Sequence, residues 1–178
     1  MRPGQGFWIK SGLLRRGGRF GTPSGKLEFY SETLAAQGLP ALPDWQPDPD
    51  SSARGPRWPL RLLTAPGYFQ AHTAYAGVAS LRKKAGAPEC VLHPDDAAAR
   101  GLRAGQPVEL FNERGAVTFV LRVSDETSPG VAFVPGQRPV GEAVAGTVNM
   151  LCSTEYSDMG EGATYQSTRL EARAPRPA

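Results

Sequence analysis

The sequence contains only two cysteines, Cys90 and Cys152, among 178 residues. Small secreted domains held together by disulfides carry many more, and an iron–sulfur cluster ligated by this chain alone would need about four. Two small buried thiols are the favoured interpretation, although one disulfide between them stays open. The chain is therefore not a disulfide scaffold, and it cannot supply all the ligands of an iron–sulfur cluster.

Histidine is equally scarce, with two in the chain. Cys90 and His93 have a Cys-x-x-His spacing, and His72 and Cys152 would complete four ligands for zinc. Structural zinc sites usually have closely spaced ligands on both sides, which His72 and Cys152 do not provide. The favoured alternative is that Cys90 ends a strand and His93 caps a helix beginning at Pro94.

The sequence also lacks a long apolar run that could enter a membrane. Its longest uncharged run, residues 62–81, contains Pro66, Gly67, Gln70 and His72. Such a run predicts a strand followed by a loop that protein or ligand covers, not a membrane helix. No apolar segment typical of a signal peptide is present. We therefore expect no direct membrane insertion and, for an independent gene product, a cytoplasmic location by default.

Charge of one sign is not concentrated in the main part of the chain. There are 20 Lys and Arg against 17 Asp and Glu, and the basic excess lies before Trp58. A nucleic-acid-binding face needs clustered basic residues with interleaved aromatics, so no nucleic-acid partner is expected. Also absent are the Gly-x-Ser-x-Gly elbow of hydrolases, a phosphate loop ending in Gly-Lys-Ser/Thr, and the Gly-x-Gly-x-x-Gly dinucleotide fingerprint.

Turn-forming residues are abundant, with 21 Gly and 17 Pro. Both interrupt helices, so the composition favours short elements joined by many turns. Three parts are expected: a leader over residues 1–39, an extended proline-rich linker over 40–58, and a main domain over 59–174. Within the leader, residues 27–30 are predicted to form a strand, and a short helix is predicted between its N-cap Ser31 and Gly38.

The main domain is predicted to consist of several short strands and one firm helix. The helix is predicted over residues 93–101, with Pro94 in its first turn, acids at the positive end of its dipole and Gly101 as terminator. Short apolar or alternating runs bounded by turns predict the strands. These runs span residues 60–64, 107–111, 116–123, 131–134 and 168–173. The pattern predicts a mainly β fold, a small closed or nearly closed barrel.

Two polar, glycine-bearing loops, residues 67–73 and 147–168, are the candidate functional segments. One interpretation makes them surface loops whose Asn and Asp residues form turns. The other makes them a site for a large polar ligand with phosphates and a purine. Backbone N–H groups with Thr or His donors can hold a diphosphate without bulk positive charge, and an Asp or Asn can pair with the edge of a guanine. Composition alone leaves both interpretations open.

Short motifs follow one another along nearly the whole chain, from Gly17 to Ala174. They include Gly-Arg-Phe at 18–20, Thr-Pro-Ser-Gly-Lys-Leu-Glu-Phe-Tyr-Ser at 22–31, His-Pro-Asp-Asp-Ala-Ala-Ala-Arg-Gly-Leu at 93–102, Val-Glu-Leu-Phe-Asn-Glu-Arg-Gly at 108–115, Val-Asn-x-Leu at 148–151 and Asp-x-Gly-x-Gly-Ala-Thr-Tyr at 158–165. In number and order they resemble the C-terminal part of the molybdopterin-dependent oxidoreductases, the enzymes related to dimethyl sulfoxide reductase, formate dehydrogenase and polysulfide reductase.

The resemblance implies a double-psi β-barrel, similar to the aspartate-decarboxylase fold, over residues 59–174. It also implies a ligand, the bis(molybdopterin guanine dinucleotide) cofactor carrying Mo or W. By position in the family's motifs, the cofactor-binding residues are expected to be Gly67, His72, Thr73, Asn149, Asp158, Tyr165 and Gln166. No catalytic residue and no metal ligand is expected within this chain.

The sequence departs from the family pattern at a few positions. Cys152 stands where many members have Thr, Gln166 stands where many have Lys, and residues 64–66 lack an Arg that members often carry. The missing Arg hints at a subgroup near the sulfur-compound reductases. These departures concern the polar groups around one pterin.

In the complete enzymes of this family, the metal ligand and usually an iron–sulfur site lie upstream of the matched region. The resemblance therefore implies a cofactor-binding piece that is inactive alone and whose partner is the remainder of the oxidoreductase. The alternative is a free-standing double-psi barrel that acts as a binding adaptor without redox activity. A self-processing decarboxylase is disfavoured, because it needs a Gly-Ser bond and the sequence contains none.

Overall fold

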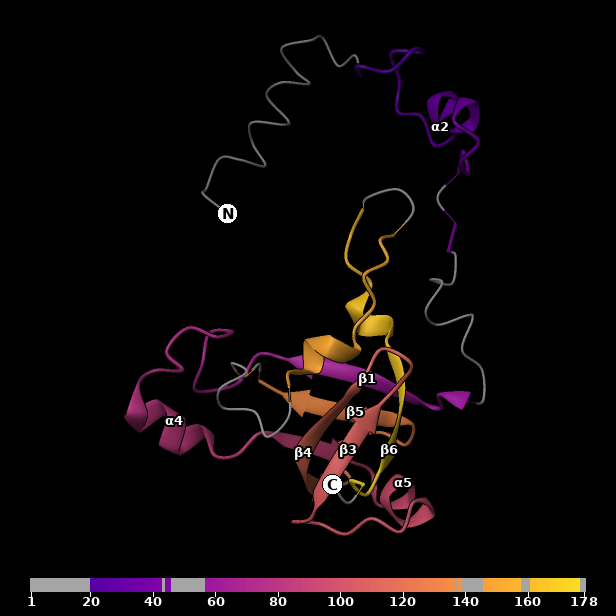
Figure 1. Ribbon diagram of the computed structural model, residues 1–178. Coiled ribbons are helices and arrows are strands. Elements are labelled where there is room, and N and C mark those ends of the chain that lie inside the picture. Colours follow the sequence, from indigo (N-terminus) through magenta and orange to yellow (C-terminus); the bar gives the residue numbers. More distant parts are fainter. Residues whose placement is uncertain are drawn as a thin grey trace. The chain divides into compact units, whose positions relative to one another are not determined.

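The structure is a computed structural model of residues 1–178, and it describes residues 20–42, 44–45, 57–136, 138, 146–157 and 161–176. It contains two compact units, Met1–Gln46 and Pro47–Ala178, each described by itself (Figure 1). Most of the predicted linker and the basic residues before Phe20 lie outside the described residues. The linker therefore stays a prediction.

The N-terminal unit contains the short helix α2, Glu32–Ala36. Ser31 caps it, because its Oγ accepts a hydrogen bond from the Leu34 amide at 3.3 Å, and Gly38 follows it with a φ of 75°. This confirms the predicted helix. The strand predicted over residues 27–30 is wrong, since these residues form bends and irregular backbone. Among residues 20–45 no described segment pairs with them, and a strand needs a partner for its backbone groups.

The second unit is a closed barrel of six strands in the order β1-β5-β2-β4-β3-β6. The strands are β1 Leu60–Ala65, β2 Glu89–Leu92, β3 Pro107–Phe111, β4 Ala116–Val123, β5 Val131–Pro135 and β6 Arg169–Arg173. They confirm the barrel and the five strand spans predicted from the sequence, each to within a residue. Cys90 does not end its strand, because β2 continues to Leu92.

The strand order contains two interlocked crossovers. β5 lies between the consecutive strands β1 and β2, and β2 lies between the consecutive strands β4 and β5. β1 is parallel to β5 and β2 is parallel to β4, whereas all other neighbours are antiparallel. Exchanging the first three strands with the last three leaves every pairing unchanged. This is the double-psi arrangement that the resemblance implied.

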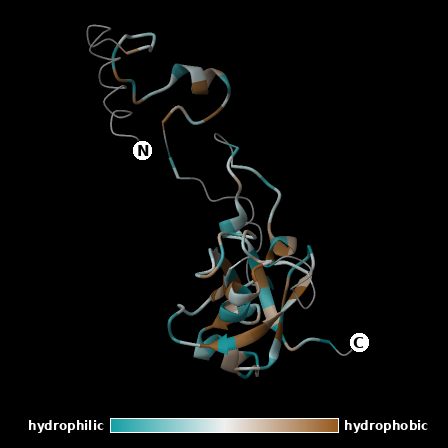
Figure 2. Cartoon of the chain, turned by 90° about the vertical axis from the view of Figure 1, so that its left-hand side faces the viewer, coloured by the Kyte–Doolittle hydropathy of each residue, from teal (hydrophilic) through white to brown (hydrophobic). Residues whose placement is uncertain are grey.

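Side chains alternate along the strands between the inside of the barrel and its surface. β1 places Leu60 and Leu62 inside and Arg61 and Leu63 outside, and β4 alternates in the same way. Apolar residues are accordingly interspersed with polar ones along the strands in Figure 2. Fully burying one such leucine stabilises the fold by about 1.5–3 kcal/mol. The barrel interior is a packed apolar core.

Two α-helices accompany the barrel among the described residues. Helix α5, Pro94–Ala99, confirms the predicted helix and its cap, because Nδ1 of His93 accepts a hydrogen bond from the Asp95 amide at 3.2 Å. Helix α4, Ala79–Ala85, was not predicted from the sequence. Neither these helices nor any other within the described residues has the length and hydrophobicity needed to cross a membrane.

The strand directions determine at which end of the barrel each connection lies. We call one end the loop end; it carries residues 66–88, 112–115 and 136–168. We call the other the helix end; it carries residues 93–106 with α5, residues 124–130, and the points where the chain enters and leaves the barrel. In Figure 1, α5 marks the helix end. The two polar loops noted in the sequence both belong to the loop end.

Candidate functional site

Every described residue of the predicted site lies at the loop end. Gly67, His72 and Thr73 come from the connection between β1 and β2. Asn149 lies on η3, Val148–Leu151, and Tyr165 and Gln166 lie on η4, Tyr165–Ser167. Asp158 lies outside the described residues. Loops that are distant in the sequence are thus brought to one end of the barrel, where parallel β1 and β5 both finish.

Gly67 lies where the backbones that leave β1 and β5 touch. The amide of Gly136 donates to the carbonyl of Ala65 at 2.8 Å. A Cβ on Gly67 would lie 3.1 Å from Cα of Gly136, and a Cβ on Gly136 would lie 3.3 Å from Cα of Gly67. Gly136 also has a φ of +76°, which favours glycine. The structure therefore gives Gly67 a steric reason to be glycine.

Gln70 lies beside this glycine contact and was not singled out from the sequence. It is only 7% exposed. Its Oε1 lies 3.8 Å from the position that a Cβ on Gly67 would occupy, and its Nε2 has no hydrogen-bond partner among the described residues. Leaving a buried donor unpaired costs about 1–3 kcal/mol. The sequence signal was present but weak, since Gln70 is one of several polar residues in its loop.

A second buried polar group at the loop end also lacks a partner. Thr168, immediately before β6, is completely buried, and its Oγ1 makes no hydrogen bond among the described residues. Its carbonyl accepts from the Leu62 amide at 2.9 Å, which places it against β1. Buried polar atoms are nearly always paired in folded proteins, so two unpaired ones at one end of the barrel call for an explanation.

His72 and Thr73 lie at the tip of an exposed turn. His72 has a φ of 55° and Tyr75 a φ of 67°, both in the left-handed region that residues with a side chain seldom adopt. The Ala74 amide closes the turn on the carbonyl of Ala71 at 3.0 Å. Residues 71–75 are exposed, so no described part of the chain covers the tip of the loop that the sequence predicted to be covered. Both side chains are accessible to a ligand.

Asn149 is presented outward by the buried ends of η3. Val148 and Leu151 pack into the core, whereas Asn149 and Met150 are exposed. The Cys152 amide donates to the carbonyl of Asn149 at 3.1 Å and closes the turn. This arrangement leaves the amide side chain of Asn149 at the surface of the loop end.

The connection from η3 to β6 forms a finger of two adjacent arms (Figure 1). Tyr156 pairs with Ala163 across the arms, and Oγ1 of Thr164 donates to the carbonyl of Glu155 at 3.0 Å. After the finger, Nε2 of Gln166 donates to the carbonyl of Thr64 at 3.2 Å. Gln166 thus attaches η4 to the end of β1, and one of its two amide hydrogens is already used.

Exposed large apolar side chains also gather at the loop end. All four tyrosines that follow the linker lie in its connections, and each is exposed. Among the described barrel residues, the exposed large apolar side chains are Leu63, Tyr68, Tyr75, Val78, Met150, Tyr156 and Tyr165. Only Leu63, on β1, lies outside the loop-end connections. Tyrosine is typical of binding surfaces because it combines apolar area with a polar tip.

The two cysteines and the histidines do not come together. Cys90 is fully buried in β2, where burial raises the pKa of its thiol far above the usual range. Cys152 is half-buried beside η3, and neither cysteine is in a disulfide, which excludes the pairing left open above. No group of three or more His, Cys, Asp or Glu side chains placed to hold a metal occurs among the described residues.

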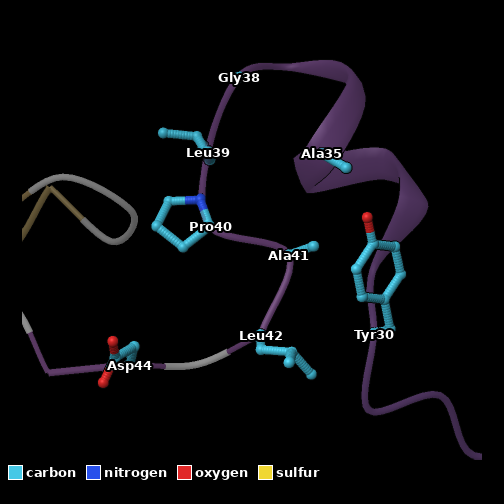
Figure 3. A pocket seen from close by; sticks show the side chains of 8 residues that line it. All are labelled: Tyr30, Ala35, Gly38, Leu39, Pro40, Ala41, Leu42 and Asp44. Carbon is cyan, nitrogen blue, oxygen red and sulfur yellow. The ribbon is translucent and has the colours of Figure 1, made fainter.

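A hollow of about 580 Å³ lies in the N-terminal unit and not at the loop end. Figure 3 shows the residues around it: Tyr30, Ala35, Gly38, Leu39, Pro40, Ala41, Leu42 and Asp44. Its single charged residue, Asp44, already accepts a hydrogen bond from the Trp45 amide at 2.8 Å. Such a lining suits apolar groups and offers little to a phosphate or a purine.

Comparisons with known proteins identify the family to which the barrel is similar. The model of the molydopterin dinucleotide binding domain matches residues 60–169. The chain is 30% identical over 154 residues to "Probable oxidoreductase YoaE" of Bacillus subtilis, covering 86% of this chain and 22% of that protein. It is 36% identical over 144 residues to the trimethylamine-N-oxide reductase of Salmonella typhi, covering 74% and 17%.

Two further comparisons bear on the fold and the extent of the chain. The dimethyl sulfoxide/trimethylamine N-oxide reductase of Cereibacter sphaeroides is 34% identical over 116 residues, which cover 62% of this chain and 14% of that protein. The acetylene hydratase of Pelobacter acetylenicus has a similar structure, with a TM-score of 0.70 and 22% identity over 86% of this chain and 24% of that one. The chain thus spans less than a quarter of each of these proteins.

The family match covers most of the barrel, from the first residue of β1 to the first residue of β6. The reductases match at 34–36% identity, and the solved structure shares the fold. The chain therefore belongs to the family of molybdopterin dinucleotide-binding domains that occur in dimethyl sulfoxide and trimethylamine-N-oxide reductases.

Proposed function

We propose that the loop end of the barrel holds a bis(molybdopterin guanine dinucleotide) cofactor with Mo or W, and that the chain is the C-terminal portion of an oxidoreductase. The single observation that carries the proposal is the family match over the barrel. When bound, such a cofactor supplies the two-electron redox chemistry, while the protein supplies binding and orientation. In this proposal, the chain itself binds the dinucleotide part of the cofactor.

The residues at the loop end fit such a group. His72, Thr73 and Asn149 offer exposed donors and acceptors without excess charge, which suits a diphosphate held by hydrogen bonds. Gln70 Nε2 and Thr168 Oγ1 are buried and find no hydrogen-bond partner among the described residues, so a ligand acceptor reaching either one would offset the cost of burying it. The bare backbone at Gly67 and Gly136 permits close approach. Asp158 stays in the proposed set through the family motif.

The substrate class of the whole protein is proposed from its relatives. The reductases among them are named for trimethylamine N-oxide and dimethyl sulfoxide. A structurally similar protein is named as a hydratase, so the fold by itself does not set the reaction. We infer a reductase of oxidised nitrogen or sulfur compounds, with the metal ligand and any iron–sulfur cluster contributed by other parts of the protein.

The proposed partner is the remainder of the oxidoreductase, and the N-terminal unit supports this. None of its described residues is buried, yet Leu27, Phe29, Tyr30, Leu42 and Trp45 are all more than half exposed. So few residues cannot build a core of their own. The alignment with the Bacillus subtilis protein extends well beyond the family match and must include more than half of the residues before position 60. We infer that this unit packs against upstream parts, and that the chain alone is inactive.

The decisive experiment is nucleotide and metal analysis of the protein purified from its native host with whatever co-purifies. Acid hydrolysis should release about two guanine nucleotides per barrel, together with Mo or W. One guanine would overturn the bis form, and none in a folded preparation would favour the adaptor without redox activity. The double variant His72→Ala/Asn149→Ala should lower the guanine content, whereas Gln106→Ala, exposed at the helix end, should not.

A further inference from the structure

We propose that Asn112, in the turn between β3 and β4, is a positioning residue that fixes the base of the finger and so orients half of the cofactor site. Its geometry is independent of any ligand, but its consequence for binding rests on the function proposed above. The sequence assigned residues 112–115 only to a hairpin turn.

The side chain of Asn112 is 7% exposed and uses its hydrogen-bonding groups on three segments. Its Oδ1 accepts from the Arg114 amide at 2.9 Å, which is the usual use of an asparagine within a turn. Its Nδ2 leaves the turn and donates to the carbonyl of Leu151 at 2.8 Å and to that of Arg169 at 3.1 Å. One amide group thus joins the hairpin to two carbonyls, 39 and 57 residues further along the chain.

Those two carbonyls are the two ends of one connection. Leu151 is the last residue of η3, and Arg169 is the first residue of β6. Everything between them, including the finger and η4, leaves the barrel at one and returns at the other. Nη1 of Arg114 adds a longer hydrogen bond to the same Leu151 carbonyl at 3.4 Å. Asn112 therefore closes this connection at its base.

The arms of the finger hold each other, so the base decides where the finger points. Tyr156 pairs with Ala163, and the amide of Ser157 donates to the carbonyl of Gly162 at 2.9 Å. The arms pair in this register only while the two points of attachment are held together, so loosening the base also weakens the bonds between the arms. Fixing both points at one buried side chain sets the position of Tyr165 within the connection and adds to the core packing that orients Asn149 just before it.

Asparagine suits this position better than the residues that resemble it. Aspartate has the same shape but no N–H group, so it would place a carboxylate against two carbonyl oxygens. Serine can donate only one hydrogen bond and is shorter. These differences provide a graded series, Asn112→Ser and Asn112→Asp, in which contacts with Leu151 and Arg169 are lost in steps.

The test is amide hydrogen exchange of the full chain, residue by residue. In Asn112→Asp, the amides of Cys152 and Ser157 should exchange about tenfold faster or more. The amide of Leu121, which donates to the carbonyl of Gln106 at the helix end at 2.9 Å, should change less than about twofold. Asn112→Ser should lie between, and it decides the question if Asn112→Asp does not fold. An equal acceleration at Leu121, or none at Cys152 and Ser157, would overturn the proposal.

The matched control is Asn149→Asp, the same chemical change at an exposed asparagine two residues from Leu151. It should leave the exchange of Cys152 and Ser157 unchanged but weaken binding of guanosine 5′-diphosphate, measured by calorimetry. If Asn112→Asp loosens the finger while the nucleotide binds neither variant nor wild type, the positioning role stands and the proposed function fails. If Asn149→Asp weakens binding while Asn112→Asp leaves exchange unchanged, the positioning role fails alone.

Discussion

The two ends of the barrel differ in how their polar side chains are hydrogen-bonded. At the helix end, Asp96 accepts hydrogen bonds from the Gly130 amide at 2.6 Å and from Nη1 of Arg100 at 3.2 Å. Arg100 also reaches Glu171 on β6, and Arg173 donates to Glu109 at 2.6 Å. None of the described residues in the connections there is a large exposed apolar side chain.

The loop end is incomplete by comparison. Gln70 and Thr168 each bury a polar atom without a partner among the described residues. Backbone at His72 and Tyr75 adopts the left-handed region, which costs of order 1–3 kcal/mol at each. The same core supports both ends, so the difference lies in the connections. The helix end is closed by contacts among its own residues, whereas the loop end leaves polar groups for which we propose the bound cofactor as partner.

The largest expected difference between the regions is in thiol reactivity. Cys90 is fully buried in β2, and burial keeps its thiol protonated, whereas Cys152 is half-buried at the loop end. In the native protein at neutral pH, a thiol reagent should modify Cys152 at least about a hundredfold faster than Cys90, because Cys90 reacts only after the barrel opens. Rates can be read by peptide mass spectrometry. In Cys152→Ser only the slow reaction should remain, and equal rates would mean that the loop end is no easier to open than the core.

Asp96→Ala should cause the largest loss of stability from a single change at the helix end. The substitution leaves the Gly130 amide without its acceptor and Arg100 without one carboxylate, so we expect a loss of about 2–3 kcal/mol in the free energy of unfolding. Urea denaturation measures it. Asp95→Ala is the matched control, since Asp95 is exposed and its carboxylate lies 3.5 Å from Nδ1 of His93, and it should cost less than about 1 kcal/mol.

Guanine nucleotide binding by Asp96→Ala and Asp95→Ala tests whether the two ends act independently. Neither change should alter binding, because both residues lie at the helix end. A loss of binding in Asp96→Ala at a temperature where the variant is fully folded would contradict the division of labour between the ends.

Much of this division could be predicted from the sequence, because it is encoded locally. The spans of β1, β3, β4, β5 and β6 follow from apolar patterns bounded by turns, and the capped helix α5 follows from Pro94 and its acids. The segments that carry the candidate site were also identified as polar, glycine-bearing loops. The strand expected over residues 27–30 failed because strand formation depends on a partner that local pattern does not supply.

Other features depend on contacts between distant residues and leave no local signal. The contact of Gly67 with Gly136, the burial of Gln70 beside it, and the reach of Asn112 to Leu151 and Arg169 all require the closed barrel. Helix α4 has no buried residue, so its sequence shows no apolar periodicity from which a helix could be predicted. Sequence therefore predicted where a site could lie, and the fold determined which side chains support it.

Gln70→Leu should have the opposite sign from Asp96→Ala. Nε2 of this buried amide has no hydrogen-bond partner in the part of the chain that the structure describes, so an apolar group of similar size should raise the free energy of unfolding of the ligand-free protein by about 1–2 kcal/mol. It should also weaken guanine nucleotide binding, as expected for a residue that contributes to binding although it destabilises the ligand-free fold. Gln106→Leu makes the same change at an exposed helix-end position and should do neither. A destabilised Gln70→Leu variant would mean that the amide contributes to the fold without a ligand.

The smallest effect is expected at an exposed ion pair of the helix end. Nη1 of Arg122 donates to Glu126 at 2.7 Å, and this hydrogen bond, together with the charge of Arg122, holds the pKa of the Glu126 carboxyl below its ordinary value. A lowered pKa in the folded state means that the pair stabilises the fold above the carboxyl's ordinary pKa, and that this contribution disappears as the pH falls through the lowered value. Glu126→Gln should therefore lower the urea midpoint slightly at pH 7, less so at high salt, and not at all at a pH below both values. A difference that persists in acid would show that Glu126 contributes through packing. Ion pairs would then contribute less to the stability of the helix end than their number suggests.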